Sequence, residues 1–385
     1  MAVTPADSQI GFAEESSYGV RVAATRFYPV FEPSFTYGKE RLESESVVKG
    51  LDIIGTEQWN GGPITVEADF GFELYQDFTG LLLKHMFGGA AVTGSGPYTQ
   101  TFTPGAIDDL SLTAQLGIAP VAGSALIPVE LLGCKITEWE IACSTDEIAT
   151  LGLTVVARDA HFGTRSVTDG VTNTDTSLTS ATAAFTQADK GKLVAGTGIA
   201  AGTTIASVTN ATTVVLSAAT TATATGVTVT IGATLASASY GALAATPFKF
   251  NHASVTVAGV ATEVTDLTLT GNNGLKTDRR FLGSELVSEP LREGRREFGV
   301  ELGAEFRDLV GINALKNGTE VAVVTTFSAG AAVLAITANC RYDEVAPTIS
   351  GTKLAEQPVK LKAVRSSTTN ASAITAVLTS ASSTV

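Results

Sequence analysis

The chain has 385 residues, of which 44% are hydrophobic, enough to bury a core in one large or two ordinary domains. Thr, Ala, Ser, Val and Gly dominate the composition, which favours many short strands and turns over long helices. The formal net charge of -13 argues against a nucleic-acid-binding surface, because such surfaces depend on Lys and Arg to neutralise phosphates.

The N-terminal residues lack the basic start, apolar stretch and small-residue cleavage site of a secretory signal. No apolar run approaches the roughly 18 residues that a membrane span requires. We therefore expect a protein that is cytosolic when made and has no membrane partner.

Residues 38–60 form a charged stretch without strand-like alternation. A structureless segment of this length inside a compact domain is usually functional or becomes ordered against a partner. We therefore interpret it as a long binding loop. Its acidic residues are Glu40, Glu43, Glu45, Asp52 and Glu57.

Three segments alternate apolar and polar residues with the period of a strand: 64–74, 135–143 and 298–306. Each therefore has one face that packs and one acidic face that meets water. Carboxylates at i and i+2 could in principle do acid–base chemistry, but this spacing on an exposed strand is typical of solvation. The carboxylates of these faces are Glu67, Asp69, Glu73, Glu138, Glu140, Glu301 and Glu305.

Helices are expected to be few and short. Residues 77–87 and 308–316 have helical spacing and stop at Gly88-Gly89 and Asn317-Gly318. Further strands are predicted at 151–157, 254–258, 264–270, 320–328, 332–339, 359–364 and 373–379. The pattern predicts an all-β sandwich with one or two short helices.

Residues 166–232 differ in composition from the rest, being almost wholly Thr, Ala, Gly, Ser and Val, with Phe185 the only aromatic residue. Runs at 192–195, 203–208, 213–216 and 227–231 read as strands between turns. We expect a small β-domain here, inserted into a discontinuous core of residues 1–165 and 233–385. Because it carries few charges, we expect it to project outward.

A second long segment, 276–297, joins two predicted strands and has six cations and five anions, a net charge of only +1. This balance favours a mixed-charge protein interface over a DNA patch. Its arginines are Arg279, Arg280, Arg292, Arg295 and Arg296.

Patterns that would indicate catalysis are missing from the sequence. There is no Gly-x-Ser-x-Gly and no local Cys/His signature, and the glycines near 196–202 fit no phosphate-binding loop. The histidines and cysteines lack metal-site spacing, so we interpret the cysteines as buried apolar residues. We expect no enzyme, cofactor or metal. These residues are His85, His161, His252, Cys134, Cys143 and Cys340.

Five segments of the chain form a further pattern: IGFAEESSYG at 10–19, AATRFYPV at 23–30, GPITVE at 62–67, DLTLTGNNGL at 266–275 and QPVKLKA at 357–363. Together they resemble the major tail (tail tube) proteins of long, non-contractile tailed phages. The resemblance spans about 1–165 and 233–385, and its motifs are diffuse. Residues 166–232 depart from the minimal pattern of the family, so their role is open.

The resemblance implies a β-sandwich with a flanking helix, six copies of which close into a ring with an inner β-barrel. Such rings would stack into the tail tube of a virion, through which DNA passes without specific binding. Partners would be further copies of the chain, a tape measure protein, a tail terminator and tail tip proteins. The acidic strand faces would then line the channel, unless they are ordinary solvated outer faces, and 38–60 and 276–297 would join stacked rings.

Two other interpretations stay open. A secreted or cell-surface adhesin fits the Thr- and Ala-rich composition and the acidic charge but lacks a signal peptide. Another phage structural component, such as a decoration protein, shares the composition.

Overall fold

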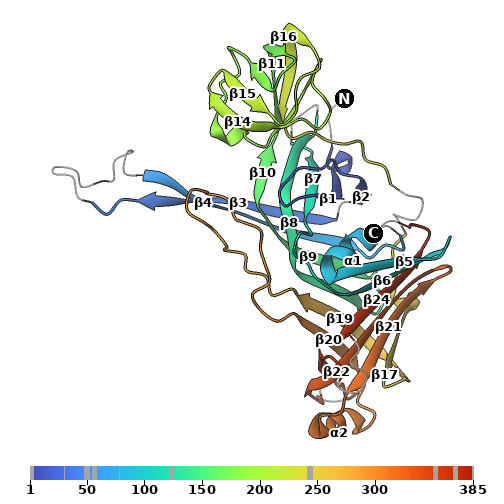
Figure 1. The fold of residues 1–385 in the computed structure, drawn as a ribbon. Helices are drawn as coiled ribbons and strands as arrows, with labels where there is room; N and C mark the ends of the chain where they lie inside the picture. Colours follow the sequence, from blue (N-terminus) through green and yellow to red (C-terminus); the bar gives the residue numbers. More distant parts are fainter. Residues whose placement is uncertain are drawn as a thin grey trace.

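The structure is a computed structural model that describes residues 4–29, 31–46, 53, 59–77, 79–121, 125–240, 246–349, 354–366 and 372–383. The chain is 55% strand and 7% helix, which confirms the predicted all-β class. Two layers of antiparallel sheet form the body, a small separate sheet lies at one end, and a long arm projects from the side (Figure 1).

The front layer is one continuous sheet with the strand order β3–β4–β9–β8–β19–β20–β23–β22. The bounds are β3 (Glu32–Glu43), β4 (Trp59–Glu73), β8 (Ile127–Ser144), β9 (Thr150–Ala157), β19 (Val264–Asn272), β20 (Glu297–Ala304), β22 (Ala332–Val345) and β23 (Val359–Ala363).

The back layer has two parts, with the strand orders β2–β1–β7–β8–β10 and β18–β17–β21–β22–β24–β6–β5. The long strands β8 and β22 belong to both layers and so hold them together. The additional strands are β1 (Gln9–Glu14), β2 (Arg26–Tyr28), β5 (Gly88–Thr93), β6 (Tyr98–Pro104), β7 (Leu112–Ile118), β10 (Asp159–Phe162), β17 (Ala253–Val257), β18 (Val260–Thr262), β21 (Val321–Ala329) and β24 (Ile374–Ser380).

The core lies between the layers and is built from the apolar faces of the predicted strands. On β4, Val66, Phe70 and Phe72 are almost fully buried, while the intervening Glu67 and Asp69 are exposed. Phe12 of β1 packs edge-on against Phe70, with ring centroids 5.4 Å apart. Burying each such side chain contributes roughly 1.5–3 kcal/mol, so this alternation fixes which face of the sheet meets water.

Helix α1 (Gly80–Phe87) is nearly all buried and ends at Gly88, whose φ of 89° is the left-handed conformation that glycine tolerates. Helix α2 (Val310–Asn317) ends in the same way at Gly318, with φ 61°, but has no buried residue. Short 3-10 turns are η1 (Pro5–Asp7), η3 (Gln187–Asp189) and η4 (Phe250–His252).

The separate sheet at the top of Figure 1 has the strand order β13–β16–β11–β12–β15–β14 and a hydrophobic core of its own around Phe185 and Val214. Hydrogen bonds from Val194 N to Thr203 O (2.8 Å) and from Ile205 N to Lys192 O (3.0 Å) join its two edge strands. That this sheet is an inserted domain in a discontinuous core stays a prediction. Its strands are β11 (Thr164–Asn173), β12 (Ser177–Thr179), β13 (Leu193–Gly196), β14 (Ile205–Asn210), β15 (Thr213–Leu216) and β16 (Thr223–Gly232).

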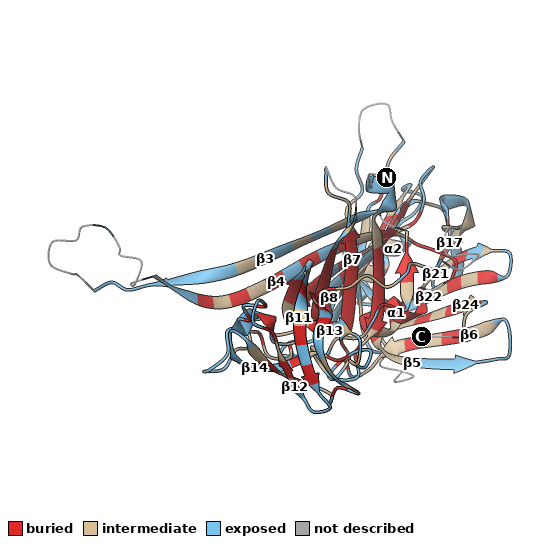
Figure 2. Cartoon of the chain, turned by 90° about the horizontal axis from the view of Figure 1, so that it is seen from above, coloured by how far each residue is buried: buried red, intermediate tan, exposed pale blue. Residues whose placement is uncertain are grey.

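The prediction of a loop over 38–60 is wrong at both ends, because 38–43 belongs to β3 and 59–60 to β4. These residues pair with each other from Gly38↔Thr65 to Glu43↔Trp59, whereas β4 pairs with β9 only from Val66 onward. The result is a two-stranded arm that extends beyond the body and is largely exposed (Figures 1 and 2). A two-stranded ribbon that is exposed on both faces has no buried side that requires apolar residues. The arm sequence therefore lacks the alternation of apolar and polar residues that indicates a strand.

The three cysteines are free and buried, as predicted. Burial raises the pKa of the Cys340 thiol to about 12 and that of Cys134 further, so both stay protonated. Over the described ranges no helix has the length and apolarity to cross a membrane, and no His, Cys, Asp and Glu side chains group as metal ligands.

Candidate functional site

The outer surface of the front sheet carries a continuous band of carboxylates, which we call the acidic face. Strand β9 lies between β4 and β8, and β19 lies between β8 and β20, so the three acidic strands predicted from sequence are next-but-one neighbours in one sheet. The acidic face consists of Glu67, Asp69, Glu73, Glu138, Glu140, Glu297 and Glu301.

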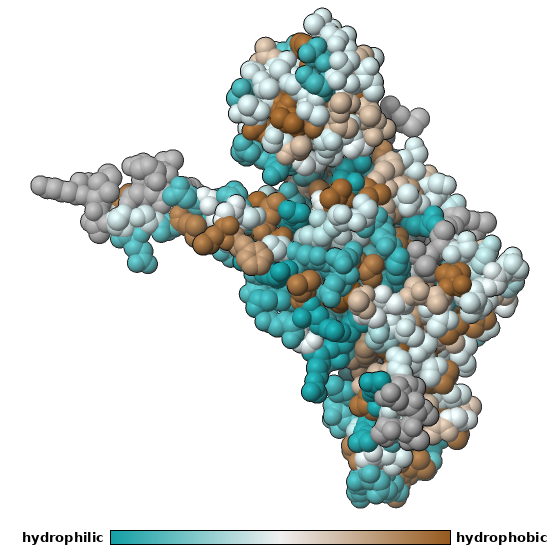
Figure 3. Space-filling model, viewed as in Figure 1, coloured by the Kyte–Doolittle hydropathy of each residue, from teal (hydrophilic) through white to brown (hydrophobic). Residues whose placement is uncertain are grey.

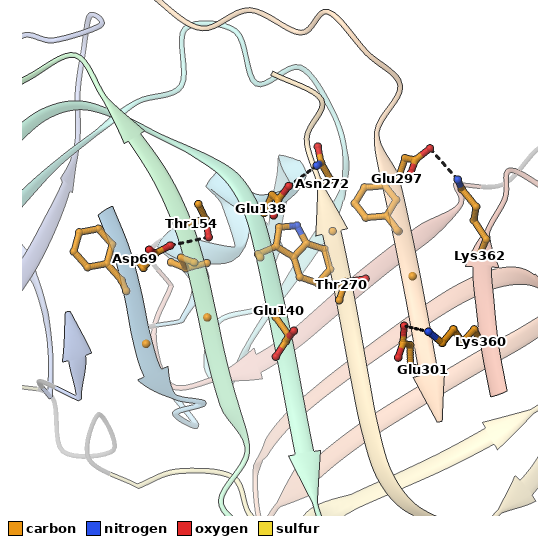
Figure 4. Close-up of a pocket in the computed structure, with 18 of the residues that line it drawn as sticks. Asp69, Glu138, Glu140, Thr154, Thr270, Asn272, Glu297, Glu301, Lys360 and Lys362 are labelled. Atoms are coloured by element: carbon orange, nitrogen blue, oxygen red, sulfur yellow. Dashed lines mark hydrogen bonds and ion pairs between the residues drawn. The ribbon is translucent and has the colours of Figure 1, made fainter. Parts of the chain in front are cut away.

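Neutral strands keep these like charges apart. One row across the sheet runs Asp69, Thr154, Glu138, Asn272 and Glu297. Thr154 Oγ1 donates to Asp69 Oδ1 (2.9 Å) and Asn272 Nδ2 donates to Glu138 Oε1 (2.7 Å), as Figure 4 shows. With strands about 4.8 Å apart, charged residues in a row lie roughly 10 Å apart, where salt screens most of their repulsion.

The next row has little side-chain bulk, which hollows the acidic face. It runs Gly71, Gly152, Glu140, Thr270 and Gly299, with three glycines on strands otherwise rich in larger residues. The hollow has a volume of about 870 Å³ and is lined on both sides by carboxylates. In Figure 3 a hydrophilic area covers the body between the arm and its lower end.

Two lysines that the sequence analysis did not place lie at one end of the acidic face. Lys362 Nζ is 2.8 Å from Glu297 Oε1, and Lys360 Nζ is 3.6 Å from Glu301 Oε1 (Figure 4). The sequence feature that could have placed these lysines on one strand face is the alternation of Lys360, Leu361 and Lys362 on β23. The two lysines neutralise only part of the face, because in the described part of the chain the carboxylates of β4 and β8 on this face form no ion pair with a Lys or Arg side chain.

Glu305 is the one predicted face residue that lies apart. Strand β20 ends at Ala304, one residue before it, so the predicted strand 298–306 is too long at this end. Its carboxylate lies 3.4 Å from Arg307 Nη2 in an exposed pair.

The predicted inter-ring residues fall into three groups. Glu40 and Glu43 lie on the β3 side of the arm and Glu45 just beyond it, all exposed, whereas Asp52 and Glu57 lie outside the described residues. Arg292 and Arg295 are exposed on the connection between β19 and β20. The other three arginines bind their own chain.

Arg280 and Arg296 tie the connection 273–296 to the body, whereas Arg279 bonds within the connection itself. Arg279 Nη1 donates to Glu289 O (2.9 Å), and Arg296 Nη1 donates to Phe87 O (2.7 Å) at the end of α1. Arg280 Nη2 donates to Ile64 O (3.1 Å) at the base of the arm.

Two further contacts join the same connection to the arm. Lys39 Nζ lies 2.6 Å from Glu285 Oε2, and Ile64 N donates to Glu285 O (2.8 Å). The two segments predicted to form interfaces therefore meet each other within one chain, at the base of the arm.

The segment 10–19 owes its residue types to a buried carboxylate. Glu15 is 3% exposed, and its oxygens accept hydrogen bonds from Gly19 N (2.7 Å), Ser111 Oγ (2.6 Å), Thr113 Oγ1 (2.8 Å) and Gly133 N (2.8 Å). A carboxylate so well satisfied anchors the loop after β1 to β7 and β8.

A second buried carboxylate lies close by. Glu130 is fully buried and accepts hydrogen bonds from Arg21 Nε (2.8 Å) and Gln115 Nε2 (3.1 Å). Both carboxylates thus hold the N-terminal segment to β7 and β8.

The two-layer antiparallel fold, the acidic face and the projecting arm are features of a structural β-protein. The chain belongs to the phage tail tube protein family, whose sequence model matches residues 5–217 and 212–363. No curated protein matches the chain in sequence. Membership gives the chain a structural role in a phage tail tube, self-assembly into that tube and a place in the virion tail.

Proposed function

We propose that the chain closes into rings of six tail-tube units, with the acidic face turned toward the central hole. Stacked rings then form the conduit through which the genome leaves the capsid. The observation that carries this proposal is that the acidic face is one continuous sheet surface, not a set of separate solvated strands.

An acidic lining has a physical purpose in such a conduit. DNA carries a phosphate for roughly every 1.7 Å of duplex, and any cationic wall would bind it. Carboxylates on the wall repel the passing polymer, so it moves without sticking. The chain would be made in the host cytoplasm and, in the tail, would contact a tape measure protein, a tail terminator and tail tip proteins.

Reversing the charge of the acidic face tests the proposal. The double variant Glu138→Lys with Glu140→Lys replaces two exposed carboxylates at the middle of the face. We expect tubes of normal length and slower DNA ejection, because the wall now attracts phosphate. The measurement is ejection from purified virions, followed by the fluorescence of a DNA-binding dye.

The matched control is Glu147→Lys with Glu263→Lys, which changes the net charge equally at exposed positions away from the acidic face. Its ejection should match the unmodified virion. Equal ejection rates from both double variants would contradict a channel-facing role for Glu138 and Glu140.

A further inference from the structure

Two stretches of the chain build the same arrangement of elements. Repeat one (5–162) contains η1, β1, β2, β3, β4, α1, β7, β8, β9 and β10, and repeat two (250–380) contains η4, β17, β18, β19, β20, α2, β21, β22, β23 and β24. The front order β3–β4–β9–β8 recurs as β19–β20–β23–β22, and the back order β2–β1–β7–β8–β10 recurs as β18–β17–β21–β22–β24. Hairpin β5–β6 is extra in repeat one.

The likeness extends to single residues. Helices α1 and α2 are both eight residues long and end at a left-handed glycine. Cys134 on β8 is paired with the first residue of β7, and Cys340 on β22 with the first residue of β21. Just after each cysteine the ladder has a register shift, between Ile136 and Glu138 and between Tyr342 and Glu344.

Two strand pairs join the repeats, β6 with β24 in the back layer and β8 with β19 in the front sheet, and only the second joins strands that both repeats possess. The register of this second pair places Glu138 opposite Asn272 and Ser144 opposite Asp266. The equivalent strands at the two outer ends of the front sheet have no such neighbour in the described part of the chain. Strand β3 pairs with β4 alone, and residues 341–345 of β22 pair with β23 alone. Unpaired edges of this kind are templates for adding another strand.

We propose that β22 of one chain pairs with β3 of the next chain in the way that β8 pairs with β19 within the chain. The register follows from the repeats. Glu344 follows Cys340 by four residues, as Glu138 follows Cys134. Ladder partners lead from Glu138 through Thr154 and Asp69 to Ser34 on β3, and from Glu344 through Lys360 and Glu301 to Thr268 on β19. Ser34 is therefore equivalent to Thr268, and Gly38 is equivalent to Asn272, four residues further on. Glu344 of one chain therefore lies opposite Gly38 of its neighbour.

The exposed helix α2 supports the same partner. In repeat one, α1 is buried partly by repeat two, since Phe87 stacks on Phe298 with centroids 6.3 Å apart. Its counterpart α2 has no buried residue, and Leu309 and Val310 are 56% and 66% exposed. When the next chain pairs its β3 with β22, its repeat one comes to lie beside α2. Within one chain, repeat two lies beside α1 in the same way.

The pairing changes the number of chains in the ring. This inference rests on the proposed function, in which the ring has six tail-tube units. Each chain supplies two repeats, and each repeat is one tail-tube unit. Three chains therefore close the ring, in place of the six chains expected from sequence. Head-to-tail pairing closes into a ring when a whole number of equal rotations makes a full turn.

A disulfide across the proposed joint tests both the register and the count. Gly38→Cys with Glu344→Cys would place two thiols opposite each other between neighbouring chains, within the range of Cα separations that a disulfide spans. We expect mild oxidation of assembled full-length protein to give a ladder in denaturing gels that ends at three chains. Native mass spectrometry of single rings should give three times 39.5 kDa, or 118.5 kDa.

Three controls fix the interpretation. Glu138→Cys with Asn272→Cys builds the same pair at the internal joint and should give a disulfide within one chain. Ser34→Cys with Glu344→Cys shifts the pair by four residues, roughly 13 Å along the strand, and should not link. The unmodified chain should not link either, because its three cysteines are buried.

Each of the other outcomes would refute a defined part of the proposal. A ladder that continues to six chains refutes the three-chain ring and leaves the tube intact. Normal tubes without the Gly38–Glu344 disulfide, in a preparation where the internal control pair forms, refute the β22–β3 pairing. An unmodified chain that stays monomeric under all conditions refutes the proposed function itself.

Discussion

At the joint between the repeats, the indole ring of Trp139 lies over Gly271, the residue opposite it on β19. A Cβ at position 271 would collide with this ring, which is itself packed against Phe87 and Phe298. We expect Gly271→Ala to lower the free energy of unfolding by about 1–3 kcal/mol, the usual cost of overpacking. Denaturant unfolding of the unassembled chain measures it.

Gly152→Ala is the matched control for this variant. Gly152 also lies in the front sheet, but the nearest atom to an added Cβ is Glu140 Cβ at 4.0 Å, so no neighbour has to move. Its stability should change by less than about 0.5 kcal/mol. Equal losses in the two variants would contradict the packing argument.

The ion pair of Arg21 and Glu130 gives a second test at the scale of residues. Their side chains are 7% and 0% exposed, so removing the guanidinium leaves a buried carboxylate without its counter-charge. We expect Arg21→Ala to cost about 3–5 kcal/mol. Lys39→Ala, which breaks the exposed pair with Glu285, should cost no more than about 1 kcal/mol. Thermal unfolding of both variants would show the difference, and similar melting temperatures would argue against it.

Among the elements, the arm is where reasoning from sequence was least informative. Strands such as β4 could be predicted because one face is buried and the other is wet, which gives a period of two. The arm part of β3 buries neither face, and the hairpin β5–β6 is mostly exposed along β5, so neither left that pattern. The period of two therefore revealed strands with one buried and one exposed face, but neither exposed ribbons nor strands buried on both faces, such as β7.

The arm also has a testable role in stacking. Deletion of 42–56, which we call the arm tip, leaves the paired base, where Lys39 and Ile64 contact Glu285. Rings should then form but not elongate, because the proposed ring-to-ring contact is lost. Electron microscopy of the purified variant distinguishes rings from tubes.

Removal of 166–232 is the comparison for this deletion. Those residues form a sheet with a core separate from that of the body, and we propose that it projects outward. Tubes should therefore still form without it. Long tubes from the 42–56 deletion would rule out a stacking role for the arm tip.

For the whole molecule, the acidic strands could be predicted but not their common surface. Glu67, Glu138 and Glu301 could each be assigned to the solvent-exposed face of a strand. Only the strand order shows that β9 and β19 place these strands in one sheet. The duplication was hidden for a related reason. Equivalent residues such as Cys134 and Cys340 share a position in the ladder while the sequences around them differ.

A reconstruction of the assembled tube by electron cryo-microscopy tests the central claim most directly. The account predicts a closed ring in which the front sheets form one continuous wall, with Glu67, Asp69, Glu138 and Glu140 turned toward an open channel. A tube in which these carboxylates lie on the outer surface, with another layer facing the channel, would contradict it.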